Sequence, residues 1–285
     1  MAQSDQEQLD RFLRQALDED VGPGDVTSLA CIPADAQAKA QLLVKDPGIL
    51  AGMRPARRLF ELVDPGHSFT AFKADGEAIS PGDVAFEVRS NTRALLKAER
   101  VCLNLMQRMS GIATQSNRFA FEVEDLPVKI LDTRKTTPLL RFLEKEAVCL
   151  GGCHNYRYGL YDWFMIKDNH IEACGSVRQA IEQVADYKNE NGLSDLKVTV
   201  EVRNLVELHE ALDTGQVDRI MLDNFERLLL KEAVATVNGR FETEASGGIN
   251  IHNVRETALT GVDYISVGAL THSATSLDLS LKVVG

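Results

Sequence analysis

The stretch that decides the fold is LKVTVEVRNLVELHEALDTGQVDRIMLDN, residues 196–224. Its apolar run at 196–201 predicts a strand, the pattern at 204–213 predicts a helix, and the run at 218–222 predicts a second strand. A strand, a helix and a strand in this order form one β-α-β unit, which places the two strands parallel in one sheet.

The same alternation runs through the chain from residue 128 onward, with no repeat at the level of sequence. The expected strands lie at 128–132, 162–167, 196–201, 218–222, 241–245 and 263–267, and the expected helices at 137–148, 175–190, 204–213, 225–238 and 250–260. A last apolar run covers 277–284. Six or seven such strands fit a parallel barrel better than an open doubly wound sheet.

The first part of the chain has a different pattern, of mixed α and β type. We expect a helix at 6–18, a turn-rich stretch at 21–28, and short strands at 37–44, 68–74 and 84–88. A long helix is expected at 91–121, because apolar residues recur there at helical spacing: Leu95, Ala98, Cys102, Leu105, Met109 and Ile112. A polar stripe shares that spacing and faces either solvent or an anion: Arg93, Lys97, Arg100, Asn104 and Gln107.

Composition excludes several classes of protein. The formal net charge of −11 argues against general nucleic-acid binding, which needs a broad basic surface. No run of about 18 apolar residues predicts a membrane span, and the acidic start lacks the pattern of a secretory signal. The five cysteines form no CxxC pair and indicate reduced thiols, so we expect a cytoplasmic protein.

Polar residues follow each expected strand of the second part. The strand ends are Thr133-Arg134-Lys135-Thr136, Lys167-Asp168-Asn169-His170, Glu201, Asp223-Asn224, Ser246-Gly247-Gly248 and Ser266-Val267-Gly268-Ala269. Because the carboxyl ends of barrel strands converge on one face, we expect one joint site there. A single polar residue after a strand is usually a helix cap. Six strand ends that together supply cations, carboxylates and glycines favour a common binding or catalytic site.

The residue types at these ends differ in what they can bind. The two glycine loops present backbone N–H groups suited to a phosphate. Glu201 and Asp223 end adjacent strands, so they are candidates to hold Mg²⁺ directly or through water. The alternatives are that they accept hydrogen bonds from sugar hydroxyls, or that they serve as helix caps and ion pairs. Lys167 follows an apolar run and is either a Schiff-base amine or an anion clamp, and the nearby cations Arg134, Lys135 and Arg157 favour the clamp.

Several motifs together resemble those of the quinolinate phosphoribosyltransferases, the carboxylating nicotinate-nucleotide pyrophosphorylases. They are DVTS (25–28), KAERVCLNLMQRMSGIAT (97–114), DTRKTTP (132–138), RYGLYDWFMIKDNH (157–170), VEV (200–202), MLDN (221–224), EASGGIN (244–250) and ISVGALTHS (265–273). They span nearly the whole chain in the family's order.

The resemblance implies an N-terminal α/β domain, 1–115, followed by an open, incomplete TIM-like α/β barrel, 116–285. It implies a homodimer, or a hexamer built from dimers, in which the first domain covers the neighbour's active site and Arg100 is donated in trans. It places Thr133, Arg134, Lys135, Tyr156, Arg157 and Lys167 around the substrate, and Glu201 and Asp223 near the ribose and Mg²⁺. The loops Ser246-Gly247-Gly248 and Val267-Gly268-Ala269 hold the 5′-phosphate, and the catalytic residues are Lys135, Lys167, Glu201 and Asp223.

One departure from the family pattern concerns the stretch 151–157. The family usually has Gly-Gly-Gly-x-Asn-His-Arg, whereas Cys153 replaces the third glycine here and Tyr156 replaces the histidine. A tyrosine still donates a hydrogen bond to a carboxylate, but it is neutral at pH 7. Any role that needs an imidazolium at this position is therefore in doubt.

The activity that the resemblance implies is transfer of phosphoribose from phosphoribosyl pyrophosphate (PRPP) to quinolinate in NAD biosynthesis. The products are nicotinate mononucleotide, pyrophosphate and CO₂. Three alternatives remain open at this point. They are a phosphoribosyltransferase with another acceptor, such as the molybdenum-operon homologues, a Schiff-base aldolase that uses Lys167, and a non-catalytic phosphosugar-binding protein.

Overall fold

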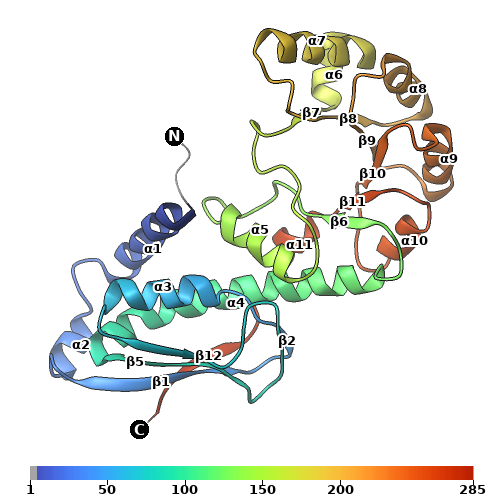
Figure 1. Cartoon of the computed structure of the whole chain (residues 1–285). Helices are drawn as coiled ribbons and strands as arrows, with labels where there is room; N and C mark the ends of the chain where they lie inside the picture. The colour runs from blue at the N-terminus through green and yellow to red at the C-terminus, as the bar shows by residue number, and fades with distance from the viewer. Residues whose placement is uncertain (1–4, 285) are drawn as a thin grey trace. The chain divides into compact units, whose positions relative to one another are not determined.

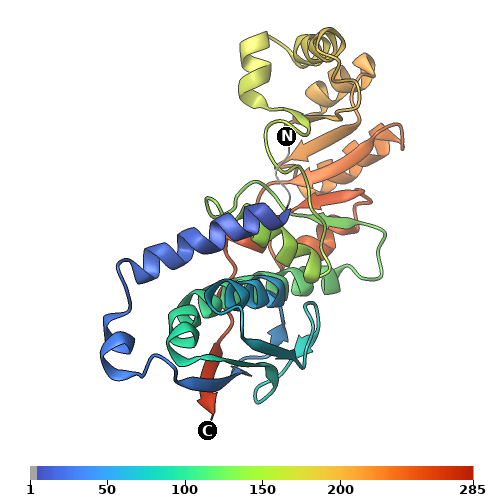
Figure 2. The ribbon, with the colours of Figure 1, turned by 60° about the vertical axis from the view of Figure 1, so that its left-hand side comes forward.

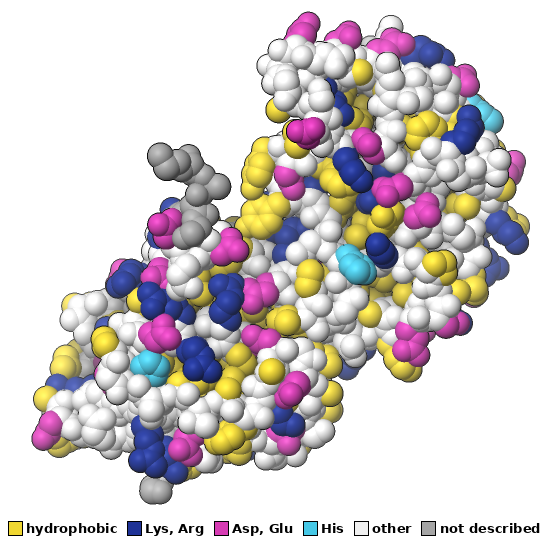
Figure 3. Space-filling view, in the orientation of Figure 1, with side chains coloured by type: hydrophobic (Ala, Val, Ile, Leu, Met, Phe, Trp, Pro, Cys, Tyr) yellow, Lys and Arg dark blue, Asp and Glu magenta, His cyan; other side chains and the backbone are white. Residues whose placement is uncertain are grey.

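The computed structural model describes residues 5–284, which divide into two compact units. Within the described part, the first unit contains residues 5–117, 137–152 and 274–284, and the second contains 118–136 and 153–273. Each unit is therefore built from more than one segment of the chain. Figure 3 shows basic and acidic side chains intermixed over the visible face, so the negative net charge does not exclude local basic patches.

The first unit is an α+β structure around an antiparallel sheet of order β12-β1-β5-β3. The strands of this sheet are β1 (Gln37–Val44), β3 (Ser68–Ala71), β5 (Val84–Asn91) and β12 (Leu279–Val284), and β2 (Gly48–Ile49) pairs separately with β4 (Ala78–Ile79). The helices are α1 (Asp5–Val21), α2 (Val26–Cys31), α3 (Met53–Val63), most of α4 (Thr92–Glu122) and α5 (Arg141–Leu150).

Helix α4 confirms the long helix expected from the apolar stripe. All six residues of that stripe are buried: Leu95, Ala98, Cys102, Leu105, Met109 and Ile112. The Asn91 side chain accepts hydrogen bonds from the first N–H groups of the helix, which fixes its start. The polar stripe is not a single solvent face, because Arg93 donates to the Ile32 carbonyl and Gln107 to the Leu279 carbonyl.

Two helices of the first unit were not expected from the sequence. Helix α2 occupies part of the turn-rich stretch, and Asp25 caps it by accepting from the N–H groups of Thr27 and Ser28. Helix α3 buries Leu59 and Phe60, and the Phe60 ring packs edge-on against Phe86 with centroids 6.2 Å apart. Short helices rich in turn formers give little periodic signal, so the pattern did not reveal α2.

The second unit contains a six-stranded parallel sheet of order β6-β11-β10-β9-β8-β7. The strands are β6 (Lys129–Leu131), β7 (Phe164–Ile166), β8 (Val198–Val202), β9 (Arg219–Asp223), β10 (Glu242–Ser246) and β11 (Tyr264–Ser266). The helices are α6 (Asp168–Cys174), α7 (Val177–Glu190), α8 (Leu205–Thr214), α9 (Arg227–Val237), α10 (Val254–Ala258) and α11 (Ala269–His272). The strands form an arc with α7 to α10 on its outer side (Figures 1 and 2).

This unit confirms the open, incomplete barrel, because β6 and β7 are the two outer strands of the sheet. Two expected parts of the barrel belong instead to the first unit. The helix expected at 137–148 is α5, and the last apolar run is β12, which pairs antiparallel with β1. Periodicity identifies a strand or a helix but not the sheet it joins, so the pattern alone did not separate these segments from the barrel.

Within the described residues, no helix is both long enough and apolar enough to cross a membrane.

Candidate active site

Seven of the predicted site residues line one pocket of the second unit, with a cavity volume of ≈ 190 Å³. The pocket is lined by Thr133, Arg134, Lys135, Tyr156, Arg157, Met165, Lys167, Met221, Ser246 and Ser266. These residues come from the carboxyl ends of β6, β7, β9, β10 and β11 and from the segment that follows Gly152. The prediction that the strand ends converge on one face is therefore confirmed.

Two lining residues were not named from the sequence, Met165 and Met221, and Ser266 was named only as part of a strand end. Met221 lies two residues before Asp223 on β9 and therefore points to the same face of the sheet. Residues two apart on a strand share a face, so the residue two positions before each polar strand end is expected to line the same pocket.

The stretch 133–136 forms a turn after β6. The Lys135 N–H donates to Thr133 Oγ1 at 3.1 Å, and the Lys135 carbonyl accepts from Thr271 Oγ1 at 2.8 Å. A Cβ placed on Gly268 would lie 3.0 Å from Lys135 Cδ, so the lysine side chain passes directly over that glycine. The turn thus brings the first strand end into contact with the second glycine loop.

Arg157 is the most notable charge in the pocket, because its side chain is almost buried and lacks a local partner. It is 9% exposed, and among residues 5–284 no group hydrogen-bonds or ion-pairs with its guanidinium. Burial and the neighbouring Arg134 charge lower the pKa of Arg157. A buried cation that is repelled by another cation is costly, and a bound anion would relieve that cost.

Lys167 ends β7 and is paired with a carboxylate of the next strand. Its Nζ lies 2.6 Å from Glu201 Oε2. An ammonium in such a pair is not a free amine, which argues against a Schiff-base role for this lysine. The neighbouring His170 accepts from the Lys167 N–H at 2.9 Å, so its side chain caps α6.

Glu201 and Asp223 lie on the same face of the sheet, as expected from their positions. Glu201 stands opposite Met221 in the parallel register, and Asp223 is two residues further along β9. Within residues 5–284 there is no group of three or more His, Cys, Asp or Glu residues arranged to hold a metal. Two carboxylates still fit Mg²⁺, which is commonly bound through few carboxylates together with waters and substrate phosphates.

The loop Ser246-Gly247-Gly248 follows β10 with two consecutive glycines at positive φ, 95° and 63°. A Cβ on Gly247 would lie 2.2 Å from Asn224 Oδ1, and the Asn224 N–H donates to the Ser246 carbonyl at 2.8 Å. Only glycine fits this close approach of the two loops. The N–H groups of Gly247 and Gly248 have no partner among residues 5–284, which leaves them free for an anion.

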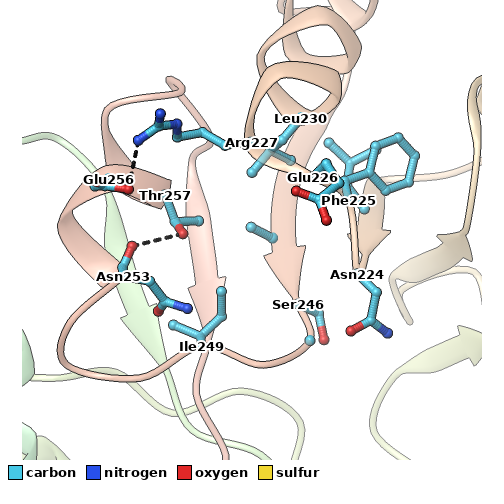
Figure 4. Close-up of a pocket in the computed structure, with 13 residues that line it drawn as sticks. Asn224, Phe225, Glu226, Arg227, Leu230, Ser246, Ile249, Asn253, Glu256 and Thr257 are labelled. Atoms are coloured by element: carbon cyan, nitrogen blue, oxygen red, sulfur yellow. Dashed lines mark hydrogen bonds and ion pairs between the residues drawn. The ribbon is translucent and has the colours of Figure 1, made fainter.

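A second pocket lies beside this loop, between α9 and α10. Figure 4 shows Asn224 and Ser246 at one end of it and the Arg227–Glu256 ion pair at the other. Because that ion pair satisfies both charges, this pocket offers less attraction to an anion than the pocket around Arg157.

The loop Val267-Gly268-Ala269 follows β11 and only part of it is available to a ligand. The Val267 N–H donates to the Leu131 carbonyl at 2.9 Å, so it is already used inside the sheet. The N–H groups of Gly268 and Ala269 have no hydrogen-bond acceptor within the described chain and lie at the start of helix α11. Any phosphate contact from this loop therefore comes from Gly268 and Ala269.

Tyr156 lines the pocket, but its hydroxyl points to the interior of the barrel. The hydroxyl oxygen lies 2.7 Å from Thr199 Oγ1 on β8. A hydrogen bond between this hydroxyl and Glu244 contributes to raising the pKa of Tyr156. Burial raises the pKa of Tyr156 well above its ordinary value, which favours the neutral side chain expected from the sequence. Cys153, three residues before Tyr156, is buried, and its φ is not positive, so the backbone there does not require the glycine that the family resemblance led us to expect.

Beneath the pocket lies a buried ion pair that the sequence did not indicate. Glu244 is 0% exposed, and its carboxylate accepts from Arg219 at 3.1 Å and from Ser266. Arg219 also donates to Glu242, and its guanidinium lies 3.7 Å from the Tyr264 ring centroid. Charged residues in alternate strand positions usually face solvent, and here they fill the interior of the barrel.

Eight predicted site residues do not line this pocket. Seven of them follow or end strands of the second unit, namely Glu201, Asp223, Gly247, Gly248, Val267, Gly268 and Ala269. The eighth is Arg100. It lies on α4 in the first unit, where it is exposed.

Comparison with known proteins agrees with this arrangement. Residues 112–282 match the family model for the C-terminal domain of quinolinate phosphoribosyl transferase, and residues 25–110 match the model for its N-terminal domain. The quinolinate phosphoribosyltransferase [decarboxylating] 1b of Nicotiana tabacum is 44% identical over 286 residues, which cover 95% of this chain and 81% of the relative.

Bacterial relatives are similar over the whole chain. The probable nicotinate-nucleotide pyrophosphorylase [carboxylating] of Bacillus subtilis is 41% identical over 276 residues, covering 97% of this chain and 93% of the relative. The solved structure of NadC from Streptococcus pyogenes superposes with a TM-score of 0.92 at 39% identity, covering 100% of both chains. The chain therefore belongs to the quinolinate phosphoribosyltransferase family.

Proposed function

We propose that this chain transfers phosphoribose from PRPP to quinolinate and releases pyrophosphate and CO₂. Its relatives are named as decarboxylating quinolinate phosphoribosyltransferases and carboxylating nicotinate-nucleotide pyrophosphorylases. The observation that supports this most directly is Arg157, a nearly buried guanidinium with no ion-pair partner in the described chain, in a pocket that also contains Arg134 and Lys135. Quinolinate has two adjacent carboxylates, and a guanidinium binds a carboxylate in bidentate geometry.

The phosphoribosyl donor occupies the loops at the other side of the same pocket in this proposal. The free N–H groups of Gly247 and Gly248 bind the 5′-phosphate, with Gly268 and Ala269 opposite them. Lys135, whose side chain lies over Gly268, adds a positive charge beside that phosphate. Ser246 lines the pocket between the two substrates.

Charge complementarity accounts for the chemical steps. The ring nitrogen of quinolinate attacks the anomeric carbon as the bond to pyrophosphate breaks, and positive charge develops on the ribose. Glu201 and Asp223 stabilise that charge, and Lys167 holds Glu201 in place through their 2.6 Å contact. The pyridinium then accepts the electron pair of the departing 2-carboxylate, CO₂ leaves, and a proton takes its place on the ring.

Mg²⁺ belongs to the same proposal. Glu201 and Asp223 are the residues that would hold it, together with water and phosphate oxygens, and it would neutralise charge on pyrophosphate. No residue of the pocket is needed as a covalent nucleophile, so the protein acts mainly by positioning and electrostatics.

The assembly and location are further parts of this proposal. Arg100 is exposed on the first unit, so a homodimer or a hexamer of dimers that donates it to a neighbour's pocket would complete the set of cations. All five cysteines are free, which suits the reducing cytoplasm.

The test supplies quinolinate, PRPP and Mg²⁺ and measures nicotinate mononucleotide by chromatography, with nicotinate as the alternative acceptor. We expect product from quinolinate alone, and loss of product in Lys167→Gln but not in the control Lys129→Gln, an exposed lysine at the opposite end of β6. Product only from another acceptor would overturn the assignment. Borohydride trapping of a substrate on Lys167 would favour an aldolase, and phosphosugar binding without turnover would favour a binding protein.

A further inference from the structure

The parallel sheet of the second unit has a gap between its outer strands, β6 and β7, which lie at the two ends of the arc (Figure 1). The segment 153–163 attaches to the β6 side of this gap. The His154 N–H donates to the Ile130 carbonyl at 2.9 Å, and the His154 carbonyl accepts from the Asp132 N–H at 3.0 Å. The Tyr156 N–H then donates to Asp132 Oδ1 at 2.8 Å.

The side chain of Tyr156 reaches β8, the neighbour of the edge strand β7 on the other side of the gap. Its hydroxyl lies 2.7 Å from Thr199 Oγ1 on β8, and Trp163 Nε1 donates to the same oxygen at 2.9 Å. The Tyr156 hydroxyl also hydrogen-bonds Glu244 on β10, which contributes to raising the pKa of Tyr156.

The ring of Tyr156 is held on both sides as well. It packs edge-on against Trp163 with centroids 5.4 Å apart, and the Arg219 guanidinium lies 5.1 Å from its centroid. Tyr156 is thus fixed to β6 through its backbone and to β8 through its hydroxyl, so the backbone at 156 has little freedom to shift.

The next residue is Arg157, which has no polar partner of its own in the described chain to set its direction. We propose that Tyr156 is a positioning residue: by joining β6 to β8 across the gap, it aims the Arg157 guanidinium at the quinolinate carboxylates. Its hydroxyl stays with Thr199 and Glu244 and does not contact the substrate. This inference rests on the proposed function, in which Arg157 binds quinolinate.

The test is a double-mutant cycle with Tyr156→Phe, which removes only the hydroxyl, and Thr199→Val, which is nearly isosteric. We expect each single variant to raise the KM for quinolinate about 10-fold, the effect of about 1.4 kcal/mol, while the KM for PRPP changes less than about 2-fold. Because both changes remove the Tyr156–Thr199 hydrogen bond, the effect of the double variant should be clearly smaller than the sum of the two single effects.

Two controls separate positioning from a general loss of structure. Thr199→Ser keeps the hydroxyl and should retain the wild-type KM for quinolinate. Tyr264→Phe removes another interior hydroxyl, which donates to Glu242 at 3.1 Å, and should also leave that KM unchanged. If Tyr156→Phe does not fold, the KM for quinolinate of Thr199→Val is compared with that of Thr199→Ser. A raised KM in Thr199→Val alone supports the inference, and equal KM values overturn it.

Three results would overturn the inference: an unchanged quinolinate KM in Tyr156→Phe, an equal rise in both KM values, or additive effects in the double variant. Absence of quinolinate turnover in the unaltered protein would instead remove the proposed function on which the inference rests, so the two failures are distinguishable.

Discussion

Replacing Arg157 with methionine should make the unliganded protein more stable while it weakens quinolinate binding. Arg157 is 9% exposed, has no ion pair in the described chain, and has its pKa lowered by burial and by Arg134. Methionine keeps an apolar stem of similar length and removes the charge. The native protein then no longer carries the cost of a buried cation that only a ligand can pair.

The expected size of both effects follows from the burial of the side chain. Replacing buried charged groups with apolar residues of similar volume often stabilises a protein by about 1–4 kcal/mol, and we expect about 2 kcal/mol here. Removing one member of a buried, hydrogen-bonded charge pair costs about 2–5 kcal/mol of binding, so the KM for quinolinate should rise at least about 30-fold.

Urea unfolding without ligand and steady-state kinetics with quinolinate as the varied substrate measure the two effects. The matched control is Arg178→Met, because the Arg178 side chain is 46% exposed and its partner Asp213 lies 3.8 Å away. The control should change stability by less than about 0.5 kcal/mol and leave the KM unchanged. A less stable Arg157→Met, or one with an unaltered quinolinate KM, would refute the reasoning.

Three further predictions concern other parts of the chain. Arg134→Ala should keep the fold and raise the KM for quinolinate by about 10- to 100-fold, the loss of one charged hydrogen bond, whereas unchanged kinetics would remove Arg134 from the site. Mixing Arg100→Ala subunits with Lys167→Ala subunits should restore activity if Arg100 acts in trans, and verified mixed dimers without activity would exclude this. The Arg58 hydrogen bond lowers the pKa of Asp10 from 3.8 to about 2, so this pair stabilises the protein above pH 4, and the contribution is lost as the pH falls toward 2. Asp10→Asn should therefore lower the free energy of unfolding in urea by about 1 kcal/mol at pH 7, after allowance for solvent screening. The difference in unfolding free energy from the unaltered protein should shrink below pH 4. A difference that grows in acid would contradict the assignment.

The strand ends of the barrel were predictable because two local signals coincide there. An apolar run marks each strand, and the polar residue that ends it must lie at the carboxyl edge of a parallel sheet. Thr133, Lys167 and Ser246 all reach the same pocket for this reason. The partners of these residues were not predictable, and the Lys167–Glu201 ion pair depends on which strands are neighbours.

The buried Arg219–Glu244 ion pair beneath the pocket was not predicted, because the sequence pattern of its strand is compatible with two different structures. Glu242 and Glu244 alternate with Thr243 and Ala245, and such alternation usually indicates a strand with one face in solvent. In a closed or nearly closed barrel the alternate face lines the interior, where Arg219 pairs with Glu244. The role of Tyr156 depends on this pairing and so was also beyond the sequence pattern.

The most direct test of the central claim uses quinolinate labelled at the 2-carboxylate, incubated with the purified protein, PRPP and Mg²⁺. The proposed function predicts that labelled CO₂ and nicotinate mononucleotide appear in equal amounts, and that neither appears when PRPP is omitted. Nicotinate mononucleotide formed without label release, or no reaction of quinolinate in a folded protein that uses another acceptor, would contradict the account.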